Sequence, residues 1–142
     1  MVISPGRKGT MATQRNPNLN AEQKRVLFGG GTEAPGTGAL LHETADGMYR
    51  CANCGAELFR SNAKYDSTTP GLIGWPSFNE AASNDALVLT PDTSLGTVRT
   101  EVTCATCGVH LGHLFEGVDN SPSGKHYCIN SSALSFDKKA AS

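Results

Sequence analysis

The sequence predicts a mainly β fold, a small antiparallel β domain with one short helix near the N-terminus. The chain of 142 residues is long enough for one domain with its own core. Its 16 glycines and 7 prolines suit short strands and many turns better than a helix bundle. Alternating polar and apolar residues, described below, provide the third observation in favour of strands.

The helix is predicted at residues 21–28. Asn20 precedes it as a good N-cap, and Gln23 follows three residues later, which is the spacing of a capping box. Three glycines at 29–31 then end the helix, because glycine adopts the backbone conformations that terminate helices. No helical period of comparable length follows.

Short apolar or alternating runs bounded by turn residues predict the strands. We expect strands at residues 48–51, 56–59, 86–89, 97–104, 109–115, 126–130 and 133–136. In the clearest of them, Val98, Thr100, Val102 and Cys104 alternate with polar residues, a pattern typical of a half-buried strand.

We expect a single domain at residues 19–137, with a flexible N-terminal tail at 1–18 and a C-terminal tail at 138–142. No acidic residue precedes Glu22, as is typical of mitochondrial targeting segments. The alternative is a flexible tail of a cytoplasmic protein. The net charge of −1 argues against a nucleic-acid partner. No apolar run reaches the ~20 residues that span a bilayer, so we expect no membrane partner. We also expect a monomer.

Four of the five cysteines form two CxxC pairs, each followed by glycine: Cys51 with Cys54, and Cys104 with Cys107. Each CxxC turn brings two thiolates within reach of one metal ion, and two such turns complete a tetrahedral shell. The expected ion is one structural zinc per chain, although iron binds in similar geometry. The alternatives are two disulfides or a thioredoxin-type redox pair. A thioredoxin-type pair normally lies in a strand–helix unit, which this sequence lacks.

The fifth cysteine, Cys128, stands alone in the predicted strand at 126–130. There the alternation places His126, Cys128 and Asn130 on one face, so that the thiol lies between a potential cation and an amide. Such surroundings favour thiolate chemistry. The alternative is an unreactive buried cysteine.

Two histidines and the only tryptophan are further candidates. His110 and His113 follow the second CxxC pair, whose metal would fix their backbone. Trp75 lies between glycine and proline in a predicted loop, where its ring can face a ligand. The alternative for each of these residues is an ordinary place in the core.

In this order the motifs resemble the methionine sulfoxide reductase B family, the peptide-methionine (R)-S-oxide reductases. The resemblance extends over residues 20–136. Its motifs are Gly-Thr-Glu at 31–33, Thr-Gly at 37–38, the first CxxC pair, Lys-Tyr-Asp-Ser at 64–67, Gly-Trp-Pro-Ser-Phe at 74–78, the most specific stretch at 99–107, and the segments 110–115 and 127–131. It implies a β-rich core around a structural zinc, and a thiol-dependent oxidoreductase that repairs oxidised proteins by reducing the R-epimer of methionine sulfoxide, mainly protein-bound.

By position, the resemblance makes Cys128 the nucleophile and His113 the leading proton donor. Asn130 is an orienting group, and His110 lines the same pocket. The thiolate attacks the sulfoxide sulfur while an imidazole that titrates near neutrality protonates the departing oxygen. Cys128 is left as a sulfenic acid, which another thiol must reduce.

The resemblance also assigns substrate-binding residues: Trp75 would receive the substrate methyl group, with Phe115 and His126 in the same set. His126 departs from the family, which often has arginine there. Because histidine carries a positive charge only when protonated, we expect activity to lean towards acid pH.

A second departure concerns recycling. Many members carry a resolving cysteine before the Gly-Trp-Pro motif, but residues 67–74 contain none. The chain therefore looks like a one-cysteine variant, with thioredoxin or glutathione and glutaredoxin as the expected reductant. The alternative is that a CxxC pair opens transiently and resolves Cys128.

A second hypothesis comes from another class of protein, a non-catalytic zinc-dependent module that binds a ligand or a protein on a related β fold. Such a module would need the two CxxC pairs. It would have no reason to combine Cys128 with His110, His113 and Trp75.

Overall fold

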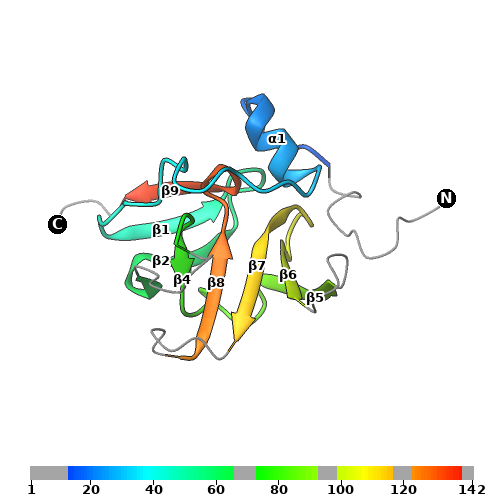
Figure 1. Cartoon of the computed structure of the whole chain (residues 1–142). Coiled ribbons are helices and arrows are strands. Elements are labelled where there is room, and N and C mark those ends of the chain that lie inside the picture. Colours follow the sequence, from blue (N-terminus) through cyan, green and yellow to red (C-terminus); the bar gives the residue numbers. More distant parts are fainter. Residues whose placement is uncertain (1–12, 66–72, 93–98, 117–122, 139–142) are drawn as a thin grey trace.

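In the computed structural model, residues 13–65, 73–92, 99–116 and 123–138 are described, and these ranges contain two antiparallel β-sheets (Figure 1). The first sheet has the strand order β2–β1–β9, with bounds Glu57–Arg60, Gly47–Cys51 and Leu134–Lys138. The second has the order β3–β4–β8–β7–β6–β5, with bounds Lys64–Tyr65, Ser77–Phe78, Lys125–Ile129, His110–Glu116, Arg99–Cys104 and Leu87–Asp92. The mainly β prediction is confirmed.

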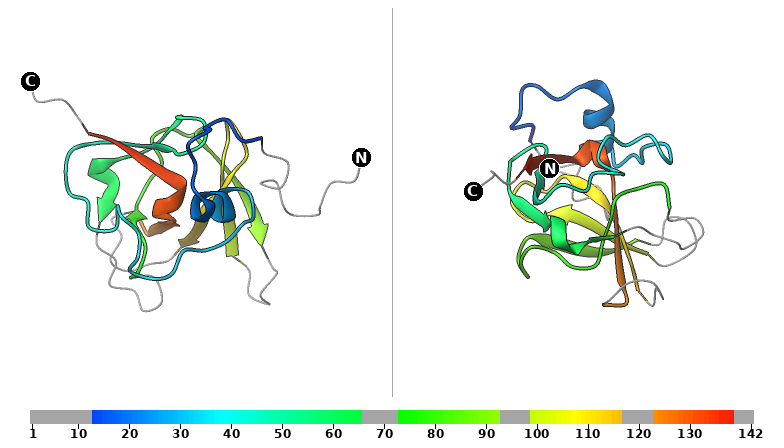
Figure 2. Two further views of the ribbon diagram at one scale, coloured as in Figure 1. Left: turned by 90° about the horizontal axis from the view of Figure 1, so that it is seen from above. Right: turned by 90° about the vertical axis from the view of Figure 1, so that its left-hand side faces the viewer.

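The predicted helix is α1, Ala21–Leu27, and its capping box is present. The Asn20 side chain accepts a hydrogen bond from the Gln23 backbone N–H at 2.8 Å, and the Gln23 side chain accepts one from the Asn20 N–H at 2.9 Å. The helix lies outside the two sheets (Figure 2), packed against β7 and the 3₁₀ turn η3, Ser131–Ala133. It is held there because Val26 and Leu27 are fully buried.

Aromatic side chains join the two sheets. Phe59 of the first sheet stacks on Phe78 of the second, with ring centroids 4.3 Å apart. Tyr49 meets the edge of Phe78 at 5.1 Å, and Tyr127 lies 5.7 Å from Phe59. Because Tyr127 and Ile129 point into this core, the intervening residue Cys128 faces the other side of the second sheet, as the alternation predicts.

The prediction of a half-buried strand at 97–104 is wrong for the part that the structure describes. Strand β6 begins at Arg99, residues 97 and 98 lie outside the described ranges, and both Glu101 and Thr103 are buried. The cause is side-chain packing on the face expected to be solvated, where the Glu101 carboxylate is buried against His110 with 2.8 Å to its Nδ1. Strands β3 and β4 were not predicted, because two residues are too few for a period to be seen.

The predicted N-terminal tail is described only from Thr13. Arg15 and Asn16 already hydrogen bond to the first CxxC turn, so hydrogen bonds to the domain begin before residue 19. Within the described ranges, no helix has the length and apolar character needed to cross a membrane.

Candidate active site and metal centre

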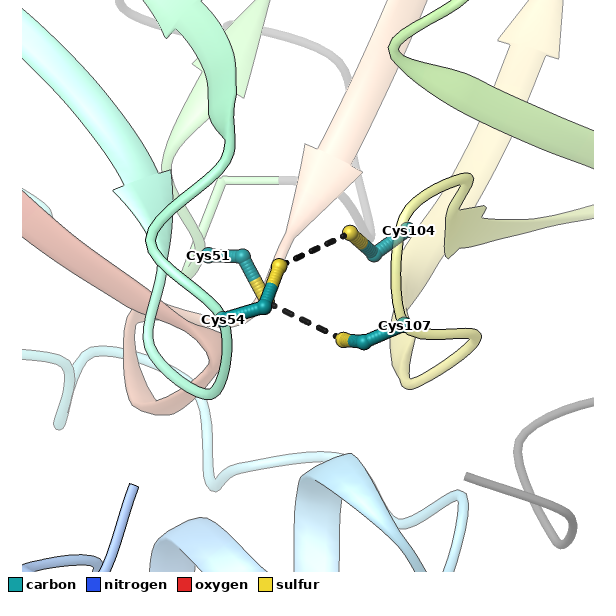
Figure 3. Close-up of side chains that lie close together, drawn as sticks. All are labelled: Cys51, Cys54, Cys104 and Cys107. Atoms are coloured by element: carbon teal, nitrogen blue, oxygen red, sulfur yellow. Dashed lines mark hydrogen bonds between the residues drawn. The ribbon is translucent and has the colours of Figure 1, made fainter. Parts of the chain in front are cut away.

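The four paired cysteines come together at the meeting point of the two sheets (Figure 3). Strand β1 of the first sheet ends at Cys51, and β6 of the second ends at Cys104. After each pair the chain turns back through a glycine with positive φ, 81° at Gly55 and 83° at Gly108. Such values disfavour any residue with a Cβ, which explains why glycine follows both pairs.

The cluster has the dimensions of a four-thiolate metal site. All four Sγ atoms lie within 4.8 Å of one another, and the Cys51–Cys107 and Cys54–Cys104 sulfur pairs are each 3.6 Å apart. A disulfide requires about 2.05 Å, and none of the five cysteines, all of them in described ranges, forms one. Metal–sulfur bonds of about 2.3 Å place tetrahedral sulfurs about 3.8 Å apart, which matches. Hydrogen bonds among these thiols lower the pKa of Cys107 and raise the pKa of Cys51 and of Cys104, as expected when neighbouring thiols share protons.

A row of polar side chains crosses the second sheet on the face opposite the aromatic core. Cys128 on β8 pairs with Ser77 on β4 and, on its other side, with His113 on β7. His113 in turn pairs with Glu101 on β6. Directly opposite residues of antiparallel strands project to the same face with Cβ atoms about 4.5–5.5 Å apart. The register therefore puts the Cys128 thiol beside the His113 imidazole.

A β-bulge in β7 adds His110 to this row. Val102 pairs with Gly112 but Thr103 pairs with His110, so Leu111 is an extra residue. Regular alternation would point His110 and His113 to opposite faces. Instead their ring centroids are 5.5 Å apart, and His110 Nδ1 lies 2.8 Å from the Glu101 carboxylate, with both side chains 1% exposed.

Glu101 was not predicted as a site residue, because it is one of the polar residues that alternate with the apolar ones at 97–104. The available signal was an acidic residue inside a strand that directly precedes a metal ligand pair. His110 Nε2 is buried and has no hydrogen-bond partner among the described residues.

Gly112 permits the close approach of β7 to β8, the strand that carries Cys128. A Cβ built on Gly112 would collide with the backbone carbonyl of Cys128 and come within 3.0 Å of the Ile129 Cα. Only glycine fits this close approach of two backbones.

Cys128 is a protonated thiol in the resting protein. Burial raises its pKa to about 12, and the negative charge of Glu33 adds to the effect. The expectation of a thiolate before substrate binds is therefore not supported.

His126 is not the cation that the sequence suggested. It is fully buried, and its Nε2 lies 2.8 Å from Ser77 Oγ. Burial lowers the pKa of His126 to about 4, so the ring is neutral near physiological pH and across most of the mildly acid range. The expected shift of activity towards acid pH through His126 loses its physical basis. Its ring meets those of Tyr65 and Phe115 edge-on, with centroids 5.5 and 6.4 Å away.

Asn130 is engaged with the backbone. Its Oδ1 accepts a hydrogen bond from the Glu33 N–H at 2.9 Å, and its Nδ2 donates to the Leu111 carbonyl at 3.0 Å. The side chain is 3% exposed. Asn130 thereby connects the bulge of β7 to the residues after α1.

Trp75 lies in the loop before β4 and is partly buried. Its indole N–H donates to the Glu33 carbonyl at 2.9 Å. The next residue, Pro76, accepts a hydrogen bond from Ile129 N–H at 3.0 Å, which holds this loop beside the Cys128 strand. The loop expected to lack a resolving cysteine lies mostly outside the described ranges, at residues 66–72.

Fold and site together define a metal-binding β domain with a separate cysteine among histidines. Comparisons with known proteins give the family: the SelR domain model matches residues 19–138. The chain is 52% identical to "Peptide methionine sulfoxide reductase MsrB" of Leifsonia xyli, over 83% of this chain and 82% of that protein. It is 50% identical to the Synechococcus protein of that name over 85% of each chain, and 43% identical to the Escherichia coli one over 88% of each. The chain belongs to the MsrB family.

The fold also resembles a solved structure with a different description, "Crystal Structure of Mis18 'Yippee-like' Domain". The TM-score is 0.51 at 17% identity, over 68% of this chain and 99% of that chain. At this identity the likeness concerns the fold alone.

Loss of a cluster cysteine tests the metal site. Cys54→Ser should release the metal and lower the thermal midpoint of unfolding, because metal binding is coupled to folding. Metal analysis and thermal unfolding measure both effects, with the Cys128→Ser variant as a matched cysteine control. A Cys54→Ser protein with full metal content and unchanged stability would contradict the assignment.

Proposed function

We propose that the protein reduces the R-epimer of methionine sulfoxide, mainly in proteins, with Cys128 as the nucleophile. Family membership supports the reaction class, since the relatives carry the name of that reductase. The observation that carries the proposal is the pairing of Cys128 with His113 on one face of the sheet, where both side chains are partly buried. The partly buried ring of Trp75 lies beside the same strand and supplies an apolar surface for a methyl group.

The protonation state of Cys128 fits the balance of the reaction. A thiol and a sulfoxide together contain all the atoms of a sulfenic acid and a thioether, so no further proton is consumed. The Cys128 sulfur attacks the sulfoxide sulfur as the thiol proton passes through His113 to the sulfoxide oxygen. The hydroxyl then passes from the substrate sulfur to the Cys128 sulfur as the S–O bond to methionine and the transient bond between the two sulfurs break. Methionine is released and Cys128 becomes the sulfenic acid. A thiol with a pKa of about 12 can thus bring its own proton to the reaction.

Zinc is the ion that we propose for the cluster, one per chain, because four thiolates in tetrahedral spacing are its usual structural site. Bound there, it would hold the two CxxC turns together and take no part in the sulfoxide reaction. Cys51, Cys54, Cys104 and Cys107 would hold it.

The competing function is a non-catalytic binding module. The Yippee-like likeness favours considering it, because a related fold occurs under a description that names no reductase. Binding alone does not require a bulge that turns His110 towards His113, nor a single cysteine thiol beside these two histidines. We therefore favour the reductase.

Two substitutions test the catalytic roles. Cys128→Ser should abolish sulfoxide reduction and leave the metal and fold intact, because the nucleophile is separate from the cluster. His113→Gln should slow turnover by roughly 10²–10⁴-fold, the usual effect of removing general acid–base catalysis. Turnover of a methionine sulfoxide peptide with dithiothreitol measures both. Substantial activity in Cys128→Ser would refute the mechanism, and an active His113→Gln would move the proton donor to His110.

Recycling is expected to use an external thiol, thioredoxin or glutathione with glutaredoxin, in a reducing compartment such as the cytoplasm or the mitochondrion. The chain has five cysteines, and four of them form the metal cluster. One turnover without reductant should leave a sulfenic acid at Cys128, trapped by dimedone, with all metal retained. Peptide mapping decides the point. A disulfide between Cys128 and a cluster cysteine, formed at the rate of turnover with metal release, would show the alternative route.

A further inference from the structure

We propose that Glu33 is a positioning residue that holds Trp75 and the chain after Cys128 in one fixed arrangement. The catalytic part of this inference rests on the proposed function. Its main test measures fluorescence and thiol alkylation, which do not depend on that function. Glu33 belongs to the 31–38 segment after α1 and is 2% exposed. It lies nearly one hundred residues in sequence from Asn130, Ser131 and Ser132.

The Glu33 carboxylate is satisfied by the turn that follows the Cys128 strand. Its Oε2 accepts a hydrogen bond from Ser131 N–H at 2.9 Å. Its Oε1 accepts two, from Ser132 N–H at 2.9 Å and from Ser132 Oγ at 3.0 Å. The donors begin η3, whose first N–H groups have no partners within the turn. A buried carboxylate with three donors fixes the backbone three residues after the thiol.

The Glu33 backbone makes two further contacts to the site. Its N–H donates to Asn130 Oδ1, and its carbonyl accepts from the Trp75 indole, each at 2.9 Å. One residue therefore connects the tryptophan ring, the asparagine and the end of the nucleophile strand. A displacement of Glu33 would therefore move the Trp75 ring, Asn130 and the end of the Cys128 strand together.

Neighbouring glycines show that the 31–38 segment is tightly packed. A Cβ on Gly38 would collide with Ser131 Oγ and come within 2.5 Å of Glu33 Oε2. A Cβ on Gly74 would lie 2.6 Å from Pro35, and Gly36 N–H donates to the Gly74 carbonyl at 2.8 Å. These contacts leave Glu33 little room to shift when its hydrogen bonds are weakened.

The Glu33 charge also acts on Cys128. Three titratable groups face or flank that thiol: His113 from β7, His126 on β8 itself, and Glu33 from the 31–38 segment. Of the three, Glu33 is the one that adds to the burial effect in raising the pKa of the thiol. Removal of its charge should lower that pKa, so that more thiolate is present at any given pH.

The variant Glu33→Gln tests both effects, with Glu57→Gln as the matched control. Glu57 is an exposed acid of β2 whose carboxylate pairs with Arg50 of the neighbouring strand. In Glu33→Gln one amide N–H₂ replaces an acceptor, so a donor faces a donor. The fluorescence of Trp75, the only tryptophan, should shift to longer wavelength as its indole contact loosens. Iodoacetamide should modify Cys128 faster, with the midpoint of its pH profile moved to lower pH.

Turnover gives the catalytic part of the test. KM for a methionine sulfoxide peptide should rise roughly tenfold in Glu33→Gln with a smaller change in kcat, because a displaced Trp75 weakens substrate binding in ground and transition state alike. Ser132→Ala removes one donor and leaves the carboxylate, so it should give the same KM effect in smaller measure even if Glu33→Gln fails to fold. Unchanged fluorescence and alkylation in folded Glu33→Gln, or unchanged KM in Ser132→Ala, would overturn the proposal. Changed fluorescence and alkylation without sulfoxide turnover in the parent protein would refute only the proposed function.

A separate observation leads to a second inference: we infer that residues 13–16 cover the metal cluster and slow the loss of its ion. Asn53, inside the first CxxC turn and 4% exposed, accepts hydrogen bonds from Arg15 N–H at 2.6 Å and Asn16 N–H at 3.3 Å. Its Nδ2 donates to the Thr13 carbonyl at 3.0 Å. Asn16 Nδ2 donates to the Ala52 carbonyl at 2.9 Å.

The same segment reaches the second CxxC turn. Arg15 Nη2 donates to the Thr106 carbonyl at 3.4 Å. The chain ahead of the matched SelR domain thus contacts both turns that would hold the ion.

Metal release into a chromogenic chelator tests this cover. The double variant Arg15→Ala/Asn16→Ala should release the ion several-fold faster, with the metal content at the start unchanged. The exposed α1 variant Lys24→Ala serves as the control and should release at the parent rate. Equal release rates in the double variant and the control would overturn the inference.

Discussion

The four-cysteine cluster is the constraint on which the remaining structure depends. It joins the end of β1, in the three-stranded sheet, to the end of β6, in the six-stranded sheet. Strand β6 pairs with β7, which carries His110 and His113, and β7 pairs with the Cys128 strand. The aromatic core packs the same two sheets together, but apolar contacts are non-directional and do not fix register. The cluster fixes where the hairpin of β6 and β7 begins, and hence which residues face Cys128.

The protein keeps the four cluster cysteines apart from Cys128. Four thiols lie within reach of one metal ion, while the fifth stands alone on β8, where burial raises its pKa. Around Cys128 the groups are neutral or buried: His126 is an uncharged ring against Ser77, and His110 is paired with Glu101. On the proposed mechanism the thiol, and not a preformed anion, enters the reaction.

Local signals in the sequence predicted much of this. The capping box of α1, the two CxxC turns with their glycines, and the outward placement of Cys128 follow from spacing and period alone. Three features were beyond such reasoning because they depend on distant partners. The bulge at Leu111, which turns His110 towards Glu101, exists only in the pairing of β7 with β6. The neutral state of His126 follows from burial. The role of Glu33 depends on contacts across nearly the whole chain.

The central claim is that Cys128 and the residues around it reduce one epimer of methionine sulfoxide. The most direct measurement is the exhaustive reaction of the metal-bound protein with a peptide that contains racemic methionine sulfoxide and excess dithiothreitol, followed by chiral chromatography. The account predicts that the reaction stops when half the sulfoxide is consumed and that the S-epimer is what is left. Formation of no methionine, or equal consumption of both epimers, would contradict it.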